Sequence, residues 1–389
     1  MTLQTAVATV PLHTVATIER TVVNPAQIEK GTLYVGLEHL DSDGHFVGVQ
    51  TVDEGELASS KFAFSSQHVL YGKLRPYLAK IARPHFSGVC STDILPILPG
   101  ENLDSDFLCH FLRQPRMIEL AASRSSGANL PRLSPKTLAE FAVPLPPLPE
   151  QRRIAAILDK ADELRVTRRA TLGQLNALTS AIFLEMFGDP VTNPKRWPDP
   201  KVGGLLTFQQ YGPRFFNESY SDDGIRIVRI TDLNESGSLA FSEMPRLAVS
   251  DADRDKYTLR PGDLIFARSG ATVGKVAMIR QEDPSCIAGA YFITMRFASS
   301  LAPVYARAVL TAPRVRAIVA KRSRQAAQQN FSGPAVRQLP MPLPPITLQR
   351  EFARRIVAVD RQESACRTSL AMSMNLFAAL QQRAFAGTL

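Results

Sequence analysis

The chain has 389 residues, of which 45% are hydrophobic and 21% charged, so it can bury the cores of two or three domains. No apolar run approaches the length that a membrane-spanning helix needs, and no charged, apolar leader follows Met1, so we expect a cytoplasmic protein rather than a membrane or exported one. The four cysteines have no paired spacing and indicate neither a disulfide framework nor a zinc site. The formal net charge of +9 favours a polyanionic partner.

The first 147 residues predict a strand-rich α/β domain. Between Val15 and Gly100 short segments with β-branched and aromatic residues alternate with turns such as Asp-Ser-Asp-Gly. A helical pattern follows at residues 106–123, interrupted at Pro115. A polar loop then leads into a proline run that begins at Pro144.

Residues 148–189 predict one long helix that sets the organisation of the chain. Stepping alternately four and three residues gives a seam of ten positions from Ile154 to Met186, in which most residues are apolar. A stripe that repeats every 3.5 residues is what two helices need to wrap around each other. Two separate amphipathic helices, each packed on its own domain, are the alternative.

The same organisation occurs twice. Pro144, Gln151, Asp162 and Arg169 meet identical residues 198 positions later, a spacing that we term the repeat offset, and residues 346–389 repeat the helical seam. Residues 190–345 repeat the strand-rich domain, with Tyr34–Gly44 matching residues 227–237. A looser match places Gly72 over Gly262 and Leu74 over Leu264. We therefore expect two copies of one unit, with the two helices antiparallel and related by a pseudo-two-fold axis.

Basic residues cluster within each copy. No acidic residue lies between Glu56 and Asp93, or between Asp283 and Glu351, whereas both spans contain several Lys and Arg residues. Residues 190–345 carry 21 basic against 13 acidic residues, while residues 1–147 carry 12 against 14. The basic stretches indicate either an anion-facing surface or ordinary helix faces exposed to solvent.

Catalytic motifs are missing from the sequence. Every Pro-Pro lies in a Pro-Leu-Pro-Pro run, so the Asn/Asp-Pro-Pro-aromatic motif of methyltransferases is absent. The loop from Gly270 to Lys275 resembles a Walker A loop but is one residue too short, and Val276 replaces the residue that binds magnesium. The six histidines have no metal-ligand spacing. We infer a binding protein rather than an enzyme.

The proline run and helix that start PLPPLPEQRRIAAILDKAD, the FGDP segment and the second PLPP helix resemble the specificity subunit of a Type I restriction–modification system. GDLIFARSGATVGKVAMI is a second stretch typical of that family. The second copy departs from the pattern at PLPPITLQRE, and the first copy lacks the Arg-Ser-Gly turn.

The resemblance implies an α/β fold with two homologous target-recognition domains, at 1–147 and 190–345, separated by two conserved helices that form an intramolecular coiled coil, at 148–189 and 346–389. Each recognition domain would read half of a bipartite duplex DNA target. Two methyltransferase subunits and restriction/translocase subunits would be the protein partners. The cofactors S-adenosylmethionine, ATP and magnesium would belong to those partners, and this chain would need none.

For DNA contacts we favour basic and amide side chains carried by loops. Cationic groups position the duplex on its phosphates, whereas amides suit adenine edges. The candidates of the first copy are Lys73, Arg75, Lys80, Arg124, Asn129 and Arg132. Those of the second copy are Arg268, Lys275, Arg322, Arg324, Gln325, Gln328, Gln329 and Asn330.

Two alternatives remain at this level. The chain could be the specificity module of a related single-chain restriction or phage-defence methyltransferase, which the neighbouring genes would reveal. It could also be a non-catalytic scaffold for RNA or another polyanion, which competition between RNA and duplex DNA would reveal.

Overall fold

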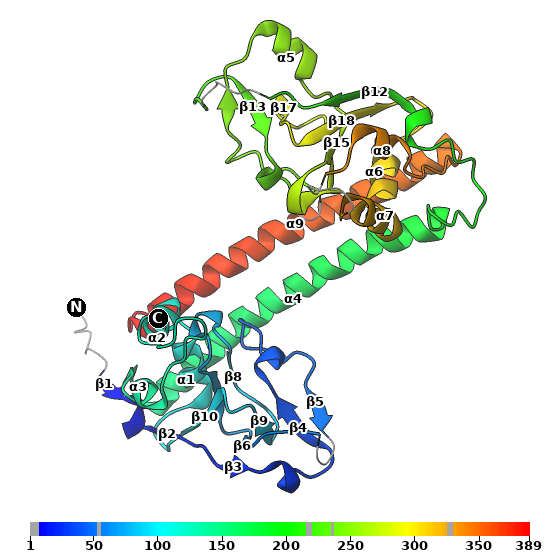
Figure 1. Ribbon diagram of the computed structural model, residues 1–389. Coiled ribbons are helices and arrows are strands. Elements are labelled where there is room, and N and C mark those ends of the chain that lie inside the picture. Colours follow the sequence, from blue (N-terminus) through cyan, green and yellow to red (C-terminus); the bar gives the residue numbers. More distant parts are fainter. Residues whose placement is uncertain (1–7, 53–55, 215–219, 235–236, 325–329) are drawn as a thin grey trace. The chain divides into compact units, whose positions relative to one another are not determined.

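The computed structural model describes most of the chain (Figure 1). The described residues are 8–52, 56–214, 220–234, 237–324 and 330–389. Within them no helix is long and apolar enough to cross a membrane. The mixture of strands and helices confirms the α/β class expected from the sequence.

Contacts divide the chain into two compact units. The first unit is Met1–Arg169 together with Thr368–Leu389, and the second unit is Ala170–Arg367. Both divisions fall inside a long helix. Each unit therefore contains one half of each long helix.

The first unit contains two larger sheets and a small one. One sheet is antiparallel throughout, with the order β2 (Ala16–Ile18), β10 (Ile94–Pro99), β7 (Val69–Gly72) and β8 (Ile81–Ala82). The other has the order β3 (Val22–Val23), β6 (Lys61–Phe64), β9 (Gly88–Cys90), β4 (Thr32–Val35) and β5 (Gln50–Val52), and pairs β4 with β9 in parallel. The small sheet pairs β1 (Thr9–Pro11) with β11 (Ala142–Pro144).

Helices of the first unit begin where the sequence provides caps. The Asp104 side chain accepts hydrogen bonds from two backbone N–H groups at the start of α1 (Ser105–Leu112), which satisfies donors that the helix cannot. Pro115 occupies the first turn of α2 (Pro115–Ser123), where its missing N–H costs nothing. The interruption predicted at Pro115 is thus confirmed. A short helix, α3 (Pro135–Ala139), is capped by Ser134.

The second unit repeats this strand pairing with its own residues. Its antiparallel sheet has the order β12 (Leu206–Tyr211), β18 (Phe292–Phe297), β15 (Leu264–Ala267) and β16 (Val276–Met278). A second sheet has the order β14 (Arg246–Leu247), β13 (Ile225–Val228) and β17 (Cys286–Ala288), and pairs β13 with β17 in parallel. The helices are α5 (Asp251–Tyr257), α6 (Pro303–Thr311), α7 (Pro313–Arg324) and α8 (Gly333–Arg337).

The strand registers correct the looser sequence match. Ile94 pairs with Gly72 in the first unit, and Phe292, at the repeat offset from Ile94, pairs with Ala267 in the second. Gly72 therefore corresponds to Ala267, and the match of Gly72 with Gly262 is wrong. Gly262 lies in the turn before β15 and has a positive φ of 89°, a conformation that favours glycine.

The two long helices are α4 (Leu148–Phe187) and α9 (Ile346–Phe385). In the first unit Ile154 and Leu158 of α4 join a buried core that includes Phe377 of α9. In the second unit Phe187 of α4 lies 5.4 Å from Phe352 of α9, measured between ring centroids. All predicted seam positions are buried or half-buried.

A buried glutamine fixes the start of each long helix. Gln151 is fully buried. Its Nε2 donates to the carbonyl oxygens of Asn102 at 2.9 Å and Pro146 at 2.8 Å, while its Oε1 accepts from the Asp104 N–H at 2.8 Å. One side chain thus joins the proline run, the loop before α1 and helix α4.

Gln349 makes the same set of bonds in the second unit. Its Nε2 donates to Ser300 O at 3.1 Å and Pro344 O at 2.8 Å, and its Oε1 accepts from the Ala302 N–H at 2.8 Å. Each of these partners lies at the repeat offset from its counterpart in the first unit. Because an unpaired backbone group in a buried site is costly, all three bonds hold the helix to its unit.

We expect Gln349→Leu to destabilise the second unit by about 3 kcal/mol or more, since three backbone groups lose their buried partner. Urea unfolding of the full chain measures this loss. Arg350→Leu, one position along α9 and exposed, is the control and should change stability by less than about 0.5 kcal/mol. Equal effects of the two substitutions would contradict the role of Gln349.

Candidate nucleic-acid interface

The end of β7 gathers predicted residues in the first unit. The Lys73 N–H donates to the Asp93 carbonyl at 2.9 Å, and the Leu133 N–H donates to the Lys73 carbonyl at 3.0 Å. These bonds bring Lys73 beside Arg132, which pairs with Leu74 through an isolated bridge. Backbone hydrogen bonds therefore place Lys73 and Arg132 next to each other.

The side chains of this cluster share one acid. The Arg132 Nε lies 3.1 Å from the Asp93 carboxylate, and the Lys73 Nζ lies 4.0 Å from it. Arg75 follows directly, exposed, with its N–H bonded to the Pro131 carbonyl at 2.7 Å. Three cations and one carboxylate leave a net positive surface, which suits phosphate contacts.

The other candidates of the first unit have separate surroundings. The ammonium group of the half-buried Lys80 donates a hydrogen bond to the Leu37 carbonyl, so it already has a partner within the first unit. The Arg124 guanidinium lies over the Phe141 ring at 5.9 Å from its centroid. Asn129 is exposed in the loop before Arg132.

The second unit uses the same backbone pattern with different side chains. The Arg268 N–H donates to Tyr291 O at 2.9 Å, and the Phe331 N–H donates to Arg268 O at 2.8 Å. The Arg268 Nε donates to Asn330 Oδ1 at 3.1 Å. Its guanidinium lies over the Tyr211 ring, 4.6 Å from the centroid. The structure thus brings Arg268 and Asn330 together. Their hydrogen bond uses the oxygen of the Asn330 side-chain amide and does not involve its N–H groups.

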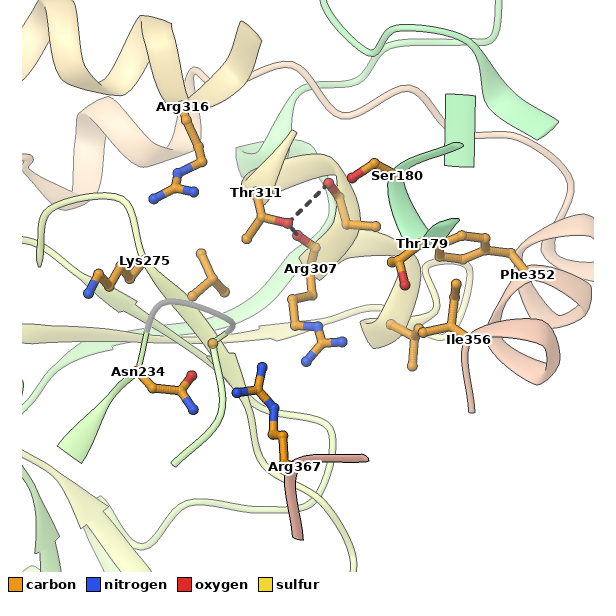
Figure 2. A pocket seen from close by; sticks show the side chains of 14 residues that line it. Thr179, Ser180, Asn234, Lys275, Arg307, Thr311, Arg316, Phe352, Ile356 and Arg367 are labelled. Atoms are coloured by element: carbon orange, nitrogen blue, oxygen red, sulfur yellow. Dashed lines mark hydrogen bonds between the residues drawn. The ribbon is translucent and has the colours of Figure 1, made fainter. Parts of the chain in front are cut away.

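The remaining candidates of the second unit are only partly described. Arg322 is exposed on α7, and Arg324 ends that helix. Lys275 is half-buried and lines a cavity with Arg307, Arg316 and Arg367 (Figure 2). The predicted Gln325, Gln328 and Gln329 lie outside the described residues.

Sequence reasoning missed an aromatic groove in the second unit. A cavity of about 730 Å³ is lined by Tyr220, Tyr291, Arg214 and Arg229, among others. Tyr220 and Tyr291 are 61% and 57% exposed. Arg229 is held in place by Asp232, whose hydrogen bond raises the pKa of the guanidinium. The sequence signal that could have indicated this groove is the presence of tyrosines in turns between strands.

The described residues offer binding groups without an evident reactive centre. They contain no group of three or more His, Cys, Asp or Glu residues placed to hold a metal ion. Burial raises the pKa of the Cys90 thiol to about 12 and that of Cys109 to about 11, so neither forms a thiolate nucleophile near neutral pH. Cationic, amide and aromatic side chains at loop ends suit contacts to phosphates and base edges.

Comparison with known proteins agrees with this picture. Residues 41–176 match a family model described as the Type I restriction modification DNA specificity domain. The specificity subunit of the Type I restriction enzyme EcoDI from Escherichia coli is 32% identical over 176 residues, covering 44% of this chain and 39% of that protein. The EcoKI specificity subunit from Escherichia coli strain K12 is 24% identical over 334 residues, covering 80% of this chain and 72% of that protein.

Solved structures share the fold. A chain from a structure on the complex assembly and conformational transition of the type I R-M system is 21% identical, with a TM-score of 0.55 and coverage of 98% of both chains. The Type I restriction-modification S subunit from M. genitalium is 12% identical, with a TM-score of 0.65 and coverage of 99% of this chain and 98% of that one. The resemblance to specificity subunits is therefore confirmed, and residues 41–176 match the DNA specificity domain of Type I restriction–modification systems.

Proposed function

We propose that the chain is the DNA sequence-recognition subunit of a Type I restriction–modification complex, in which each unit reads one half of a bipartite target. The match of residues 41–176 to a DNA specificity domain carries the proposal. That range contains Lys73, Arg75 and Arg132, the cationic cluster at the end of β7.

The recurrence of one backbone pattern supports two readers with different targets. Lys73 and Arg268 follow equivalent strands and make equivalent backbone bonds. Their neighbours differ, because Asp93 and Arg132 in the first unit correspond to Tyr291 and Asn330 in the second. Cations at shared positions can fix the duplex by its phosphates, while the differing side chains distinguish bases.

In this proposal the target-recognition domains are residues 1–147 and 190–345, and the helices at 148–189 and 346–389 form an antiparallel coiled coil between them. A helix of 40 residues is about 60 Å long, which exceeds one turn of duplex DNA. The helices would set the distance between half-sites and dock two methyltransferase subunits. Restriction/translocase subunits would complete the complex.

Catalysis would then belong to the partners, which bind S-adenosylmethionine, ATP and magnesium. We expect the purified chain alone to incorporate no labelled methyl groups into DNA. Addition of the methyltransferase subunits should produce methylation at one bipartite motif, read by sequencing the product. Methyl transfer by the chain alone, or methylation without a motif in the complex, would refute the proposal.

We expect Arg322→Ala to weaken binding to all duplexes about equally and to lower the salt slope of the binding constant by about one, because a phosphate contact is lost. Fluorescence anisotropy at several salt concentrations measures both quantities. Arg361→Ala removes an exposed arginine of α9 and is the charge-matched control. A slope change as large in the control would assign the effect to net charge alone.

We expect Asn330→Ala to relax the methylation motif in one half-site only, since an amide paired with adenine discriminates by about 1–3 kcal/mol. Asn129→Ala, in the corresponding loop of the first unit, should leave that half-site unchanged. Sequencing methylated DNA from cells that carry each variant compares the two motifs. Relaxation of both half-sites by Asn330→Ala would contradict separate reading.

A further inference from the structure

One arginine of the second unit, Arg268, is oriented by uncharged partners. It follows β15, and its backbone bonds to the Tyr291 carbonyl and the Phe331 N–H fix its position. Its Nε donates to Asn330 Oδ1 at 3.1 Å, and its guanidinium carbon lies over the Tyr211 ring, 4.6 Å from the centroid. An amide therefore holds one edge of the guanidinium and an aromatic ring holds one face.

The two side chains that hold this guanidinium are themselves fixed by the fold. The Tyr211 hydroxyl accepts from the Gly333 N–H at 2.7 Å. Asn330 forms an isolated antiparallel bridge with Ser269. Support from residues that are fixed in turn holds a side chain in one geometry. The guanidinium of Arg268 therefore has one preferred orientation.

The terminal nitrogens of Arg268, Nη1 and Nη2, are the part of the guanidinium that these contacts do not use. Neither nitrogen forms a hydrogen bond or an ion pair with another residue that the structure describes. Two N–H groups side by side in one plane match a pair of acceptors in the same plane. Arg268 is thus held by its own unit and retains two parallel donors for a partner.

Other arginines of the second unit use their donors within the fold. Arg296 donates from Nε and Nη2 to the Asp263 carboxylate, both at 2.7 Å. Arg229 donates from the same two nitrogens to the Asp232 carboxylate, at 3.2 and 2.8 Å. In both pairs the carboxylate also neutralises the cation. Arg268 differs because its Nε partner is an amide, which leaves the positive charge in place.

The first unit has an acid at the equivalent place. Arg132, at the repeat offset from Asn330, donates from Nε and Nη2 to the Asp93 carboxylate, at 3.1 and 3.5 Å. Tyr291 lies at the repeat offset from Asp93. The second unit therefore has a phenol where the first unit has the carboxylate that pairs with its arginine.

We propose that Arg268 reads a guanine in the half-site of the second unit, with Nη1 and Nη2 donating to the O6 and N7 atoms of that base. The inference rests on the proposed function and adds a residue and a base to it. Arginine bound in this way to guanine is the commonest specific contact between a side chain and a base. Asn330 positions Arg268, and its oxygen keeps a second lone pair for an adenine edge.

The orientation of Arg268 favours a base over a phosphate. A phosphate contact requires a positive charge but no fixed direction, and Lys73 provides such a point charge at the equivalent position of the first unit. A base edge requires donors at defined angles, which the contacts with Asn330 and Tyr211 supply. For Arg268 this assignment replaces the phosphate contact that its equivalence to Lys73 allows.

Sequencing of DNA methylated by the complex with the methyltransferase subunits tests the assignment. We expect a G·C pair in the half-site of the second unit. Arg268→Lys keeps the charge but loses the paired donors, so it should lower the preference for that pair about tenfold and leave the other half-site unchanged. Arg361→Lys, exposed on α9, is the matched control and should retain the whole motif.

A modified duplex tests the contact with the unchanged protein. In 7-deazaguanine a carbon replaces N7, while pairing with cytosine is retained. Placed at the expected guanine, it should weaken binding of the unchanged complex about fivefold or more, because one charged hydrogen bond is lost. Binding of the Arg268→Ala complex should weaken by less than about twofold, since the contact is already missing. Fluorescence anisotropy at one salt concentration measures both affinities.

Three results would overturn the reading of guanine by Arg268 and leave the proposed function intact. They are an unchanged motif in Arg268→Lys, which would indicate a phosphate contact, a loss of preference at an A·T pair, and an equal effect of 7-deazaguanine on the two complexes. If the complex with the unchanged chain methylated DNA without a bipartite motif, the proposed function would fail and the inference with it. If Arg268→Lys abolished methylation altogether, the comparison with 7-deazaguanine would decide.

Discussion

The connection between each sheet unit and its long helix depends on one buried amide. An amide has both a donor and an acceptor end, so Gln151 and Gln349 each join three backbone segments that share no regular secondary structure. A carboxylate could not donate, and an apolar side chain would leave the carbonyls of the proline run unpaired. Hydrogen bonds at its first turn therefore hold the start of each long helix to its unit, together with the packing of Ile154 and Leu158 in the first unit and of Phe352 and Ile356 in the second.

The two units share the same backbone hydrogen bonds and differ in the side chains around them. Lys73 and Arg268 make equivalent backbone hydrogen bonds. Their partners at the equivalent position differ in side chain, a carboxylate at Asp93 and a phenol at Tyr291. A position whose backbone serves the fold and whose side chain faces outward can change without loss of structure. Such positions allow one scaffold to present different surfaces.

Much of this organisation could be predicted from the sequence. Proline runs, the glutamines and the heptad seam act locally, so the helices at α4 and α9 and the internal repeat were evident. The correspondence of Gly72 with Gly262 failed because strand register depends on pairing with distant residues, not on matching glycines. The ion pairs of Asp43 with Arg165 and Arg169 of α4, and the groove at Tyr220, could not be predicted, since they join residues far apart in the chain. The predicted DNA contacts remain predictions, although the structure brings Lys73 near Arg132 and Arg268 near Asn330.

The first unit is discontinuous in the chain, and this has a consequence for synthesis. Phe385 of α9 packs on Phe107 and Phe111 of α1, with ring centroids 5.2 and 5.6 Å apart, so the first unit contains side chains that are made after all those of the second unit. The second unit has all its residues once Arg367 has left the ribosome, while the first still lacks part of its core. Folding would finish in the reverse of the order of translation, and shortening the C-terminal end would harm the N-terminal unit first.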